Sequence, residues 1–427
     1  MNSPQVVLYG INSVTDTLLQ SYPDAIFATT QGGGTYNDKP ILSLEALSAQ
    51  YNTPGIQIII CSMFVDDIVN ALVEHGFSLS AIYFYNITHC KVLSCENTIR
   101  KSGDTEQTLH VVYDMKVNLP CYDALSFAAV AEAERIKRKL KYIHFYMLSA
   151  NPGGNKLSFD ANYTEDDRSW RIANIVKPIF ESLPSYIGCS DIINRADLNP
   201  TMAGKLNLFP EDILTTQAGV AHGLLKLEEY YTDGIPMPEL KVQPAAASMV
   251  QTLLDHCHAQ NKKLVTLTLR NTPTHPERNT PVGPWVEFLQ SLDTDTYFPV
   301  LLRDTSECLN ATPLSQLAFE VPAATISFAL RIALYDAAYI NLSSSGGPSF
   351  AYYFLKGCSS IRYSPIDDNH FATARNTLET AGFKIGEEQF FAQNGLHQIP
   401  FEVETFESIQ QAFNHQCQML ECNTNDV

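Results

Sequence analysis

Short apolar runs alternate with amphipathic helical segments along most of the sequence, and this pattern constrains the fold more than any other feature. The first hundred residues contain four apolar runs separated by helical segments, in the order 6–10, 15–22, 25–30, 43–50, 56–62, 66–76 and 81–86. Apolar runs of this length are typical of strands that are buried on both faces. The pattern therefore predicts a parallel sheet with helices on both sides.

The same alternation continues beyond a polar stretch at 95–107. A second lobe is expected to contain a strand at 109–119, a helix at 127–140, a strand at 142–148 and a helix at 169–183. A third lobe is expected to contain helices at 246–258, 283–292, 326–336 and 349–357 and strands at 264–270, 297–303, 316–321, 337–343 and 360–365.

The chain of 427 residues is longer than one hydrophobic core usually organises. We therefore predict an α/β protein with three Rossmann-like domains. Their predicted bounds are 1–100, 101–240 and 241–403, and a C-terminal helix and tail follow at 404–427.

Composition and charge exclude several classes of function. A formal net charge of −18 without a long basic run disfavours nucleic-acid binding, which depends on Lys and Arg that neutralise phosphates. No run approaches the roughly 20 apolar residues that span a bilayer, and no secretory signal is visible. Scattered cysteines without such a signal indicate a reducing cytoplasm. The basic side chains of 132–140 leave open a peripheral contact with a membrane, although a solvated helix face explains them equally simply.

Cofactor and metal signatures are weak. The turn after the first strand, Gly10 to Ser13, lacks the three glycines that let a dinucleotide pyrophosphate approach the backbone. The sequence has no Cys-x-x-Cys pair, and Cys90/Cys95 and Cys417/Cys422 do not have zinc-finger spacing. We therefore expect no bound cofactor and no metal.

The clearest candidate for a binding site is SSSGGPS at 343–349, which follows an apolar strand and opens a predicted helix. Gly346 and Gly347 allow a tight turn, and such a junction exposes backbone N–H groups that can bind phosphate. The hydroxyls of Ser344, Ser345 and Ser349 add donors. A plain strand-to-helix connection is the alternative interpretation of the same residues.

A second polar loop follows the strand at 264–270 and carries Arg270, Arg278 and Asn279. Arginine forms paired, charge-assisted hydrogen bonds to phosphate oxygens. The carboxyl ends of parallel strands form the edge at which open α/β sheets bind ligands, so this loop and 343–349 are expected on one rim. Solubilising surface loops are the alternative.

Several segments resemble bacterial sugar transferases of the GT-B fold. LVTLTLRNTPTHPERNTPVGPW (264–285), DAAYINLSSSGGPSFAYYFLKGC (336–358) and IGEEQFFAQNGLHQIPFEVETFESI (385–409) are similar to their nucleotide-sugar lobe, which heptosyltransferase-like proteins share. YDMKVNLPCYDALSFAAVAEAERIKRK (113–139) and SWRIANIVKPIFESLPS (169–185) are similar to the other lobe. The first hundred residues resemble a Rossmann-like module fused to such enzymes. Thr280 and Phe401 depart from the serine and tryptophan of the pattern.

The resemblance implies transfer of a sugar from a nucleoside diphosphate to a glycan or glycoconjugate, in bacterial surface-polysaccharide biosynthesis. The residues that it assigns to the donor diphosphate are Arg270, Arg278, Asn279, Ser344, Ser345, Gly346, Gly347 and Ser349. Fixed cations and N–H groups can replace Mg²⁺ in stabilising the leaving diphosphate. Asp293-Thr-Asp295 has the form of a metal-binding pair, but it precedes a strand and is interpreted as a solvated helix end.

A catalytic base is expected on the second lobe if the transfer inverts the configuration at the anomeric carbon of the sugar. The candidates are Asp160, Asp166 and Asp167, each of which can equally be a loop acid or a helix cap. A retaining reaction has no such need. Two other functions stay open, a nucleotide-sugar epimerase and a non-catalytic protein that binds nucleotide sugars as a scaffold.

Overall fold

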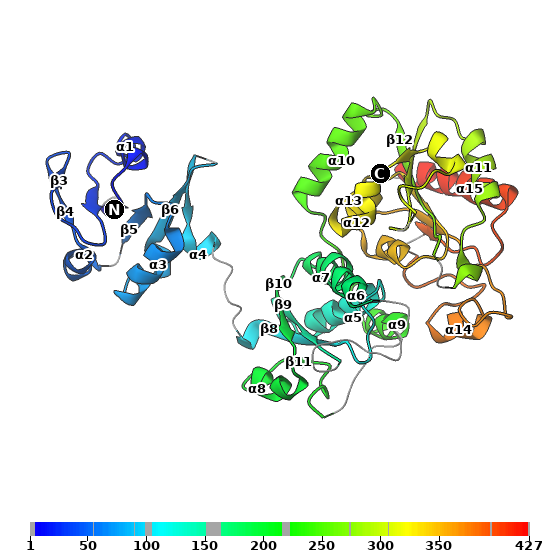
Figure 1. Ribbon diagram of the computed structural model, residues 1–427, viewed down its shortest axis with the longest axis horizontal. Helices are drawn as coiled ribbons and strands as arrows, with labels where there is room; N and C mark the ends of the chain where they lie inside the picture. Colours follow the sequence, from blue (N-terminus) through cyan, green and yellow to red (C-terminus); the bar gives the residue numbers. More distant parts are fainter. Residues whose placement is uncertain are drawn as a thin grey trace. The chain divides into compact units, whose positions relative to one another are not determined.

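The protein falls into two units, Met1–Asp104 and Thr105–Val427, shown as ribbons in Figure 1. The computed structural model describes residues 5–53, 55–88, 90–98, 105–150, 164–215, 223–272, 275–305, 307–392 and 395–425. Asp160 lies outside these residues.

The first unit is one seven-stranded sheet in the order β3-β4-β2-β1-β5-β6-β7. Its strands are β1 (Gln5–Tyr9), β2 (Ile26–Ala28), β3 (Thr35–Tyr36), β4 (Lys39–Leu42), β5 (Ile56–Ile60), β6 (Ile82–Asn86) and β7 (Lys91–Ser94). Its helices are α1 (Ser13–Leu19), α2 (Leu44–Tyr51), α3 (Val65–Glu74), η1 (Leu79–Ala81) and α4 (Cys95–Thr98).

The edges of this sheet differ from the parallel pattern expected from the sequence. β3 and β4 form an antiparallel hairpin, and β7 pairs with β6 in the antiparallel direction. The hairpin follows Gly32, Gly33 and Gly34, all of which have positive φ. Such a backbone is accessible to glycine at little cost, so the glycine-rich segment reverses the chain.

The second unit begins with a four-stranded parallel sheet in the order β10-β9-β8-β11, which we call lobe 2. Its strands are β8 (Thr108–Asp114), β9 (Tyr142–Leu148), β10 (Tyr186–Ile192) and β11 (Leu208–Phe209). Its helices are η2 (Thr105–Gln107), α5 (Ala124–Lys137), α6 (Glu165–Arg171), the π-helical η3 (Ile172–Val176), α7 (Lys177–Glu181), η4 (Arg195–Asp197), α8 (Leu198–Met202) and α9 (Gly223–Thr232).

The strand predicted at 109–119 ends at Asp114. The buried Asp114 carboxylate accepts hydrogen bonds at 2.7 and 2.8 Å from Arg195. The backbone N–H groups of Val117 and Asn118 donate to the Asp114 carbonyl, which turns the chain away from the sheet. The following residues therefore form a loop at the carboxyl edge of the sheet.

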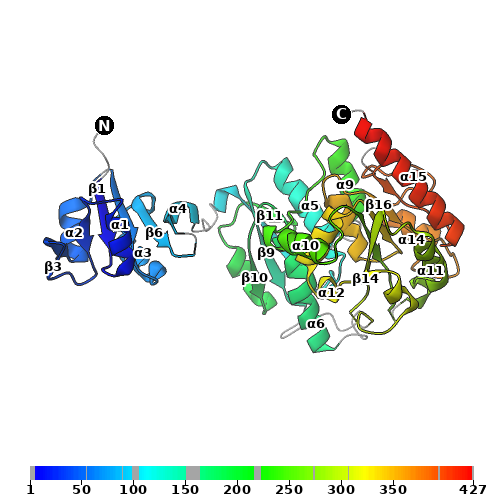
Figure 2. The same cartoon turned by 90° about the horizontal axis from the view of Figure 1, so that it is seen from above.

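Lobe 3 is a six-stranded parallel sheet in the order β14-β13-β12-β15-β16-β17. Its strands are β12 (Lys263–Thr268), β13 (Tyr297–Leu302), β14 (Phe319–Glu320), β15 (Ile340–Ser343), β16 (Ser360–Arg362) and β17 (His397–Gln398). Its helices are α10 (Pro244–His256), η5 (Pro276–Arg278), α11 (Val282–Ser291), η6 (Pro313–Gln316), α12 (Pro322–Ile326), α13 (Phe328–Ala337), η7 (Pro348–Phe354), α14 (Arg375–Thr380) and α15 (Phe406–Asn425). Figure 2 shows α15 along one side of this lobe.

Three parallel-dominated sheets confirm the predicted α/β class with Rossmann-like domains. The order of lobe 3 reverses at β12, whose neighbours are β13 and β15, and the last residues of β12 and β15 pair as Thr268 and Ser343. The loops that leave these two strands therefore start side by side. A reversal of strand order opens the crevice in which such sheets bind ligands.

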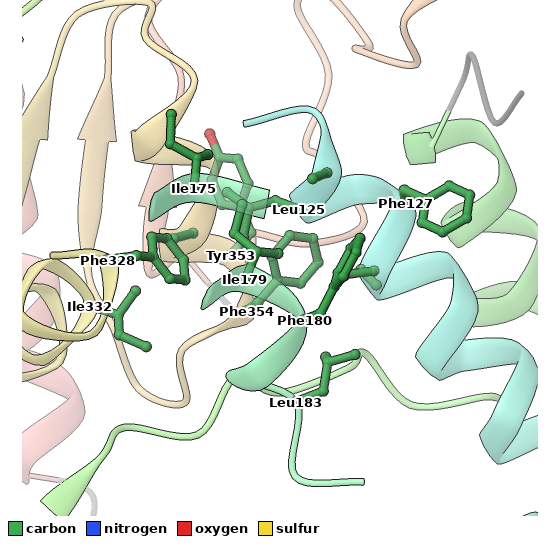
Figure 3. Close-up of a cluster of buried hydrophobic side chains, with 14 of the residues drawn as sticks. Leu125, Phe127, Ile175, Ile179, Phe180, Leu183, Phe328, Ile332, Tyr353 and Phe354 are labelled. Carbon is green, nitrogen blue, oxygen red and sulfur yellow. The ribbon is translucent and has the colours of Figure 1, made fainter. Parts of the chain in front are cut away.

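One hydrophobic core runs through both lobes of the second unit. Figure 3 shows Phe180 and Leu183 of lobe 2 in one cluster with Phe328, Ile332 and Phe354 of lobe 3. The N–H group of Leu240 also donates to the carbonyl of Phe354, at 2.7 Å, and Lys384 pairs with Glu228 across the lobes. The relative position of the lobes is thus fixed by packing.

Burial of His397 is expected to make the stability of this unit depend on pH. The imidazole is 6% exposed, packs edge-on against Tyr353 and bonds to Ser360 Oγ at 2.9 Å, and burial lowers its pKa to about 3. The unfolded chain takes up a proton below about pH 6.5 and the folded chain does not. Acidification from pH 6.5 to 4.5 should therefore remove about 2–3 kcal/mol of unfolding free energy through this group.

Denaturant titrations of the wild type and His397→Gln at both pH values measure this contribution. On acidification from pH 6.5 to 4.5, the wild type should lose more unfolding free energy than His397→Gln, because glutamine does not titrate. An identical difference at the two pH values would contradict the proposed burial of a neutral imidazole.

Candidate active site

A cavity of about 490 Å³ lies between lobe 2 and lobe 3. Lobe 2 contributes the loop after β8 and the start of α5, together with the first residues of α9. Lobe 3 contributes the loops after β12 and β15, the end of β16, and the segment around α14. The cavity is therefore bordered by the carboxyl ends of strands from two sheets.

Arg278 joins the two polar loops that the sequence predicted to meet. Its Nη2 donates to the Ser345 carbonyl at 3.0 Å and to Ser345 Oγ at 3.2 Å. Its Nε is buried without a hydrogen-bond partner among the described residues. Burial, with the nearby charges of Arg270 and Arg362, lowers the pKa of Arg278 to about 10, so it stays protonated at neutral pH.

The turn at 345–347 presents its backbone to the same cavity. Ser345, Gly346 and Gly347 line it, and within the described residues the N–H groups of Ser345 and Gly347 donate to no other group. The helix predicted at 349–357 is instead a 3₁₀ helix of seven residues, Pro348–Phe354. A short 3₁₀ segment has a small dipole, so the free N–H groups and Arg278 are the main attractions for an anion here.

Gly347 is also a point at which the two lobes approach each other closely. A Cβ atom placed on Gly347 would lie 2.7 Å from Cβ of Tyr122 in lobe 2. Because neither atom is at the flexible end of a side chain, Gly347→Ala must shift the 345–347 turn or the segment around Tyr122. We expect a loss of roughly 1–3 kcal/mol of unfolding free energy and a distorted cavity.

Gly283→Ala is the matched control, since a Cβ at Gly283 in α11 meets nothing within 4 Å. It should leave the unfolding free energy unchanged or raise it by up to about 1 kcal/mol. Thermal denaturation of both variants measures the difference. Equal stability of the two would show that the lobes are not in contact at Gly347.

The other predicted donor-site residues have different positions. Ser344 and Ser349 are buried, and their hydroxyls donate to Glu404 and to the Gly346 carbonyl, respectively. Arg270 donates to Asn279 Oδ1 at 2.5 Å and to the His275 carbonyl at 2.8 Å. The hydrogen bonds of these residues therefore stabilise the conformation of the two loops, and none of the residues lines the larger cavity.

A smaller pocket of about 40 Å³ lies on the other side of the Gly346–Gly347 turn. Arg270, Arg303, Asp304 and Arg331 line it. Arg331 is 3% exposed and donates to the Ala324 carbonyl and to the Tyr335 hydroxyl. Burial raises the pKa of Asp304, whose carboxylate accepts a hydrogen bond from the Asn271 N–H.

Arg362 is a cavity residue that sequence reasoning missed. It ends β16, is 6% exposed, and its Nε donates to Ser349 Oγ at 3.1 Å. Its Nη1 is buried without a partner among the described residues. The available signal was an arginine at the end of an apolar strand, one strand away from the 343–349 turn.

Among the described residues, the carboxylate that lines the cavity is Asp123, at the start of α5, which sequence reasoning also missed. It is exposed, and it makes no capping hydrogen bond to its helix. Asp167, in contrast, accepts hydrogen bonds from the Thr164 N–H and hydroxyl in a capping box of α6. Asp166 is exposed on the same helix, and neither Asp166 nor Asp167 lines the cavity.

The described residues contain no group of three or more His, Cys, Asp or Glu side chains placed to hold a metal ion. Asp293 accepts hydrogen bonds from the Asp295 N–H and from Thr296 Oγ1, and it lies between α11 and β13 as expected for a helix end. None of the described helices is both long and apolar enough to cross a bilayer.

Two Rossmann-like lobes border one cavity at the carboxyl ends of their strands, an arrangement consistent with a GT-B architecture. No protein-family model matches the sequence, and no curated protein matches it significantly.

Among solved structures, the chain is similar to a glycosyl transferase family 9 protein from Veillonella parvula, with 10% identity, a TM-score of 0.40, and coverage of 74% of this chain and 97% of that one. It is also similar to Escherichia coli heptosyltransferase WaaC with ADP, at 11% identity and a TM-score of 0.36 over 72% and 99% of the chains. A third similar structure is E. coli ADP-heptose lps heptosyltransferase II, with 9% identity, a TM-score of 0.32, and coverage of 98% of this chain and 99% of that one.

Proposed function

We propose that the protein is a glycosyltransferase that moves a sugar from a nucleoside diphosphate donor to a hydroxyl group of a glycan or glycoconjugate. The observation that carries this proposal is the contact between Arg278 and Ser345, which unites two donor-rich loops at the rim of an interlobe cavity. A cationic side chain and free backbone N–H groups at one point are suited to a pyrophosphate.

The chemistry follows from where the charge develops. The sugar leaves the diphosphate as the acceptor hydroxyl attacks its anomeric carbon, and the diphosphate gains negative charge. Arg278 and the N–H groups of Ser345 and Gly347 are fixed before the reaction, so they stabilise that charge without reorganisation. Asp123 lines the cavity from lobe 2, and we assign to its carboxylate the role of taking the proton of the acceptor hydroxyl.

The donor's nucleoside and sugar both belong in the larger cavity, because the smaller pocket of about 40 Å³ has room for only about one or a few waters. Gly346 and Gly347 line both pockets, so the diphosphate at this turn lies at the rim of the larger cavity. We propose that the transfer proceeds without a metal ion, because guanidinium and N–H groups supply the positive field at the leaving group.

Thermal-shift measurements with UDP, GDP, ADP and CMP, and with their sugars, test the proposal. A ligand that binds the folded protein alone raises its melting temperature by mass action. We expect one nucleoside diphosphate to stabilise the protein, with and without EDTA, and release of that diphosphate from its sugar to depend on added acceptor.

The outcomes separate the alternative functions. An epimerised sugar without acceptor would indicate an epimerase, and binding without any turnover would indicate a scaffold protein. The absence of stabilisation by every nucleotide and nucleotide sugar would reject the proposed donor site.

A further inference from the structure

Arg362 is a buried cation that the proposed transfer does not require. It is 6% exposed, its guanidinium lies 5.5 Å from the centre of the Phe383 ring, and its Nη1 has no partner among the described residues. Its Nε donates to Ser349 Oγ, which holds the guanidinium at the cavity wall. The buried Tyr353 hydroxyl also lies beside this guanidinium, whose charge favours the ionised form of that hydroxyl. The side chain is therefore fixed in place, and Nη1 is the donor left without a geometric hydrogen bond among the described residues.

Two cations but only one carboxylate of the described residues line the cavity, namely Arg278, Arg362 and Asp123. The charges of Asp123 and Glu277 favour the protonated form of Arg278, but within the described part of the chain neither guanidinium forms an ion pair. A buried charge without a counter-charge is unfavourable. Two such cations with unpartnered donors, Nε of Arg278 and Nη1 of Arg362, form a site that an anion from outside the chain would complete.

The position of Arg362 separates it from the proposed leaving group. The turn at Gly346–Gly347 borders both pockets, whereas Arg362 borders the larger cavity alone. The wall beside it is apolar and consists of Phe350, Leu378 and Phe383. The smaller pocket of about 40 Å³ has room for only about one or a few waters, so the nucleoside, the sugar and the acceptor of a diphosphate bound at the turn all share the larger cavity with Arg362.

We propose that Arg362, together with Arg278, binds a second anionic group in the larger cavity, so that the site takes an acidic sugar. The group is a carboxylate or a phosphate, and either the donor sugar or the acceptor sugar carries it. This inference rests on the proposed function for the roles of donor and acceptor, but the anion site itself does not. Planar, paired donors are suited to both kinds of anion.

Two sets of probes identify the source of the anion. UDP-glucuronic acid against UDP-glucose, and GDP-mannuronic acid against GDP-mannose, test the donor. Free glucuronic acid and glucose 6-phosphate against glucose, with and without the nucleoside diphosphate, test the acceptor. Calorimetry should show that the acidic member of one set binds roughly 10- to 100-fold more tightly than its neutral partner.

Arg362→Gln keeps an N–H donor for Ser349 and removes the charge. We expect it to abolish the preference for the acidic ligand and to leave the affinity for the nucleoside diphosphate alone unchanged. Arg362→Lys keeps the charge without the planar fork and should retain part of the preference. Arg375→Gln is the matched control, because Arg375 is exposed on α14 and pairs with Glu379 outside the cavity.

Three results would overturn the inference. They are equal affinity for acidic and neutral ligands in both sets, an equal loss in Arg375→Gln, and a loss of nucleoside diphosphate binding in Arg362→Gln as large as the loss for the acidic ligand. The last result would place Arg362 in the diphosphate site. If no nucleotide binds but free glucuronic acid still binds in preference to glucose through Arg362, the anion site stands and the transferase proposal fails.

Discussion

Replacing Asp123 with asparagine is expected to lower the turnover number roughly 10²- to 10⁴-fold, which is the usual contribution of a positioned general base. Asp123 is the carboxylate that reaches the cavity from lobe 2, and it does not cap its helix. Asparagine has nearly the same shape but cannot take a proton from the acceptor hydroxyl. Binding of the nucleoside diphosphate should be unchanged, because the residues proposed to hold it belong to lobe 3.

Steady-state rates for Asp123→Asn and Asp166→Asn, with melting temperatures as a check of folding, provide the test. Asp166 is a carboxylate of the same lobe that the sequence suggested and that does not line the cavity, so its variant should retain the wild-type rate. A wild-type rate in Asp123→Asn, or a large loss in Asp166→Asn alone, would show that Asp123 is not the base.

Replacing Arg278 with glutamine is expected to weaken nucleoside diphosphate binding roughly 10- to 150-fold, corresponding to about 1.5–3 kcal/mol for a hydrogen bond to a charged group. The variant loses the cation at the turn and the bonds that hold the Ser345 carbonyl. The effect on the rate should be at least as large, because the diphosphate gains charge as the sugar leaves. Calorimetry and initial rates measure the two effects.

The fold should survive this change. Arg278 is mostly buried with an unpartnered Nε, so its removal also relieves the burial of a charge. Arg375→Gln again serves as the control for the loss of one positive charge from an acidic chain of net charge −18. Unaltered diphosphate affinity in Arg278→Gln, in a folded protein, would falsify the assignment of the donor site.

The class of fold could be predicted from the sequence because it depends on local patterns. Buried parallel strands are short continuous apolar runs, and β12, β13 and β15 coincide closely with the runs at 264–270, 297–303 and 337–343. Strands whose residues are less apolar, or which are very short, were missed, as with β10 (Tyr186–Ile192) and the two-residue β11. Their formation depends on neighbouring strands more than on their own residues.

The meeting of Arg278 with the 343–349 turn could also be anticipated, because the carboxyl ends of neighbouring parallel strands share one edge. The sequence could not predict which serine of the turn faces the cavity. Ser344 and Ser349 have the same local pattern as Ser345, but their hydroxyls are turned into the protein by Glu404 and by the Gly346 carbonyl. The partners that decide this come from far along the chain or from the turn itself.

The sequence by itself determined the α/β class, the repeated strand–helix order and the two polar loops, since hydrophobic periodicity and turn residues act over a few positions. Only the tertiary structure decided which charged side chains enter the cavity. Asp123 and Arg362 are 239 positions apart in the chain of 427, and they line one cavity because packing between lobe 2 and lobe 3 brings the two strand ends together. That packing depends on side chains distributed over both lobes, and no local pattern encodes it.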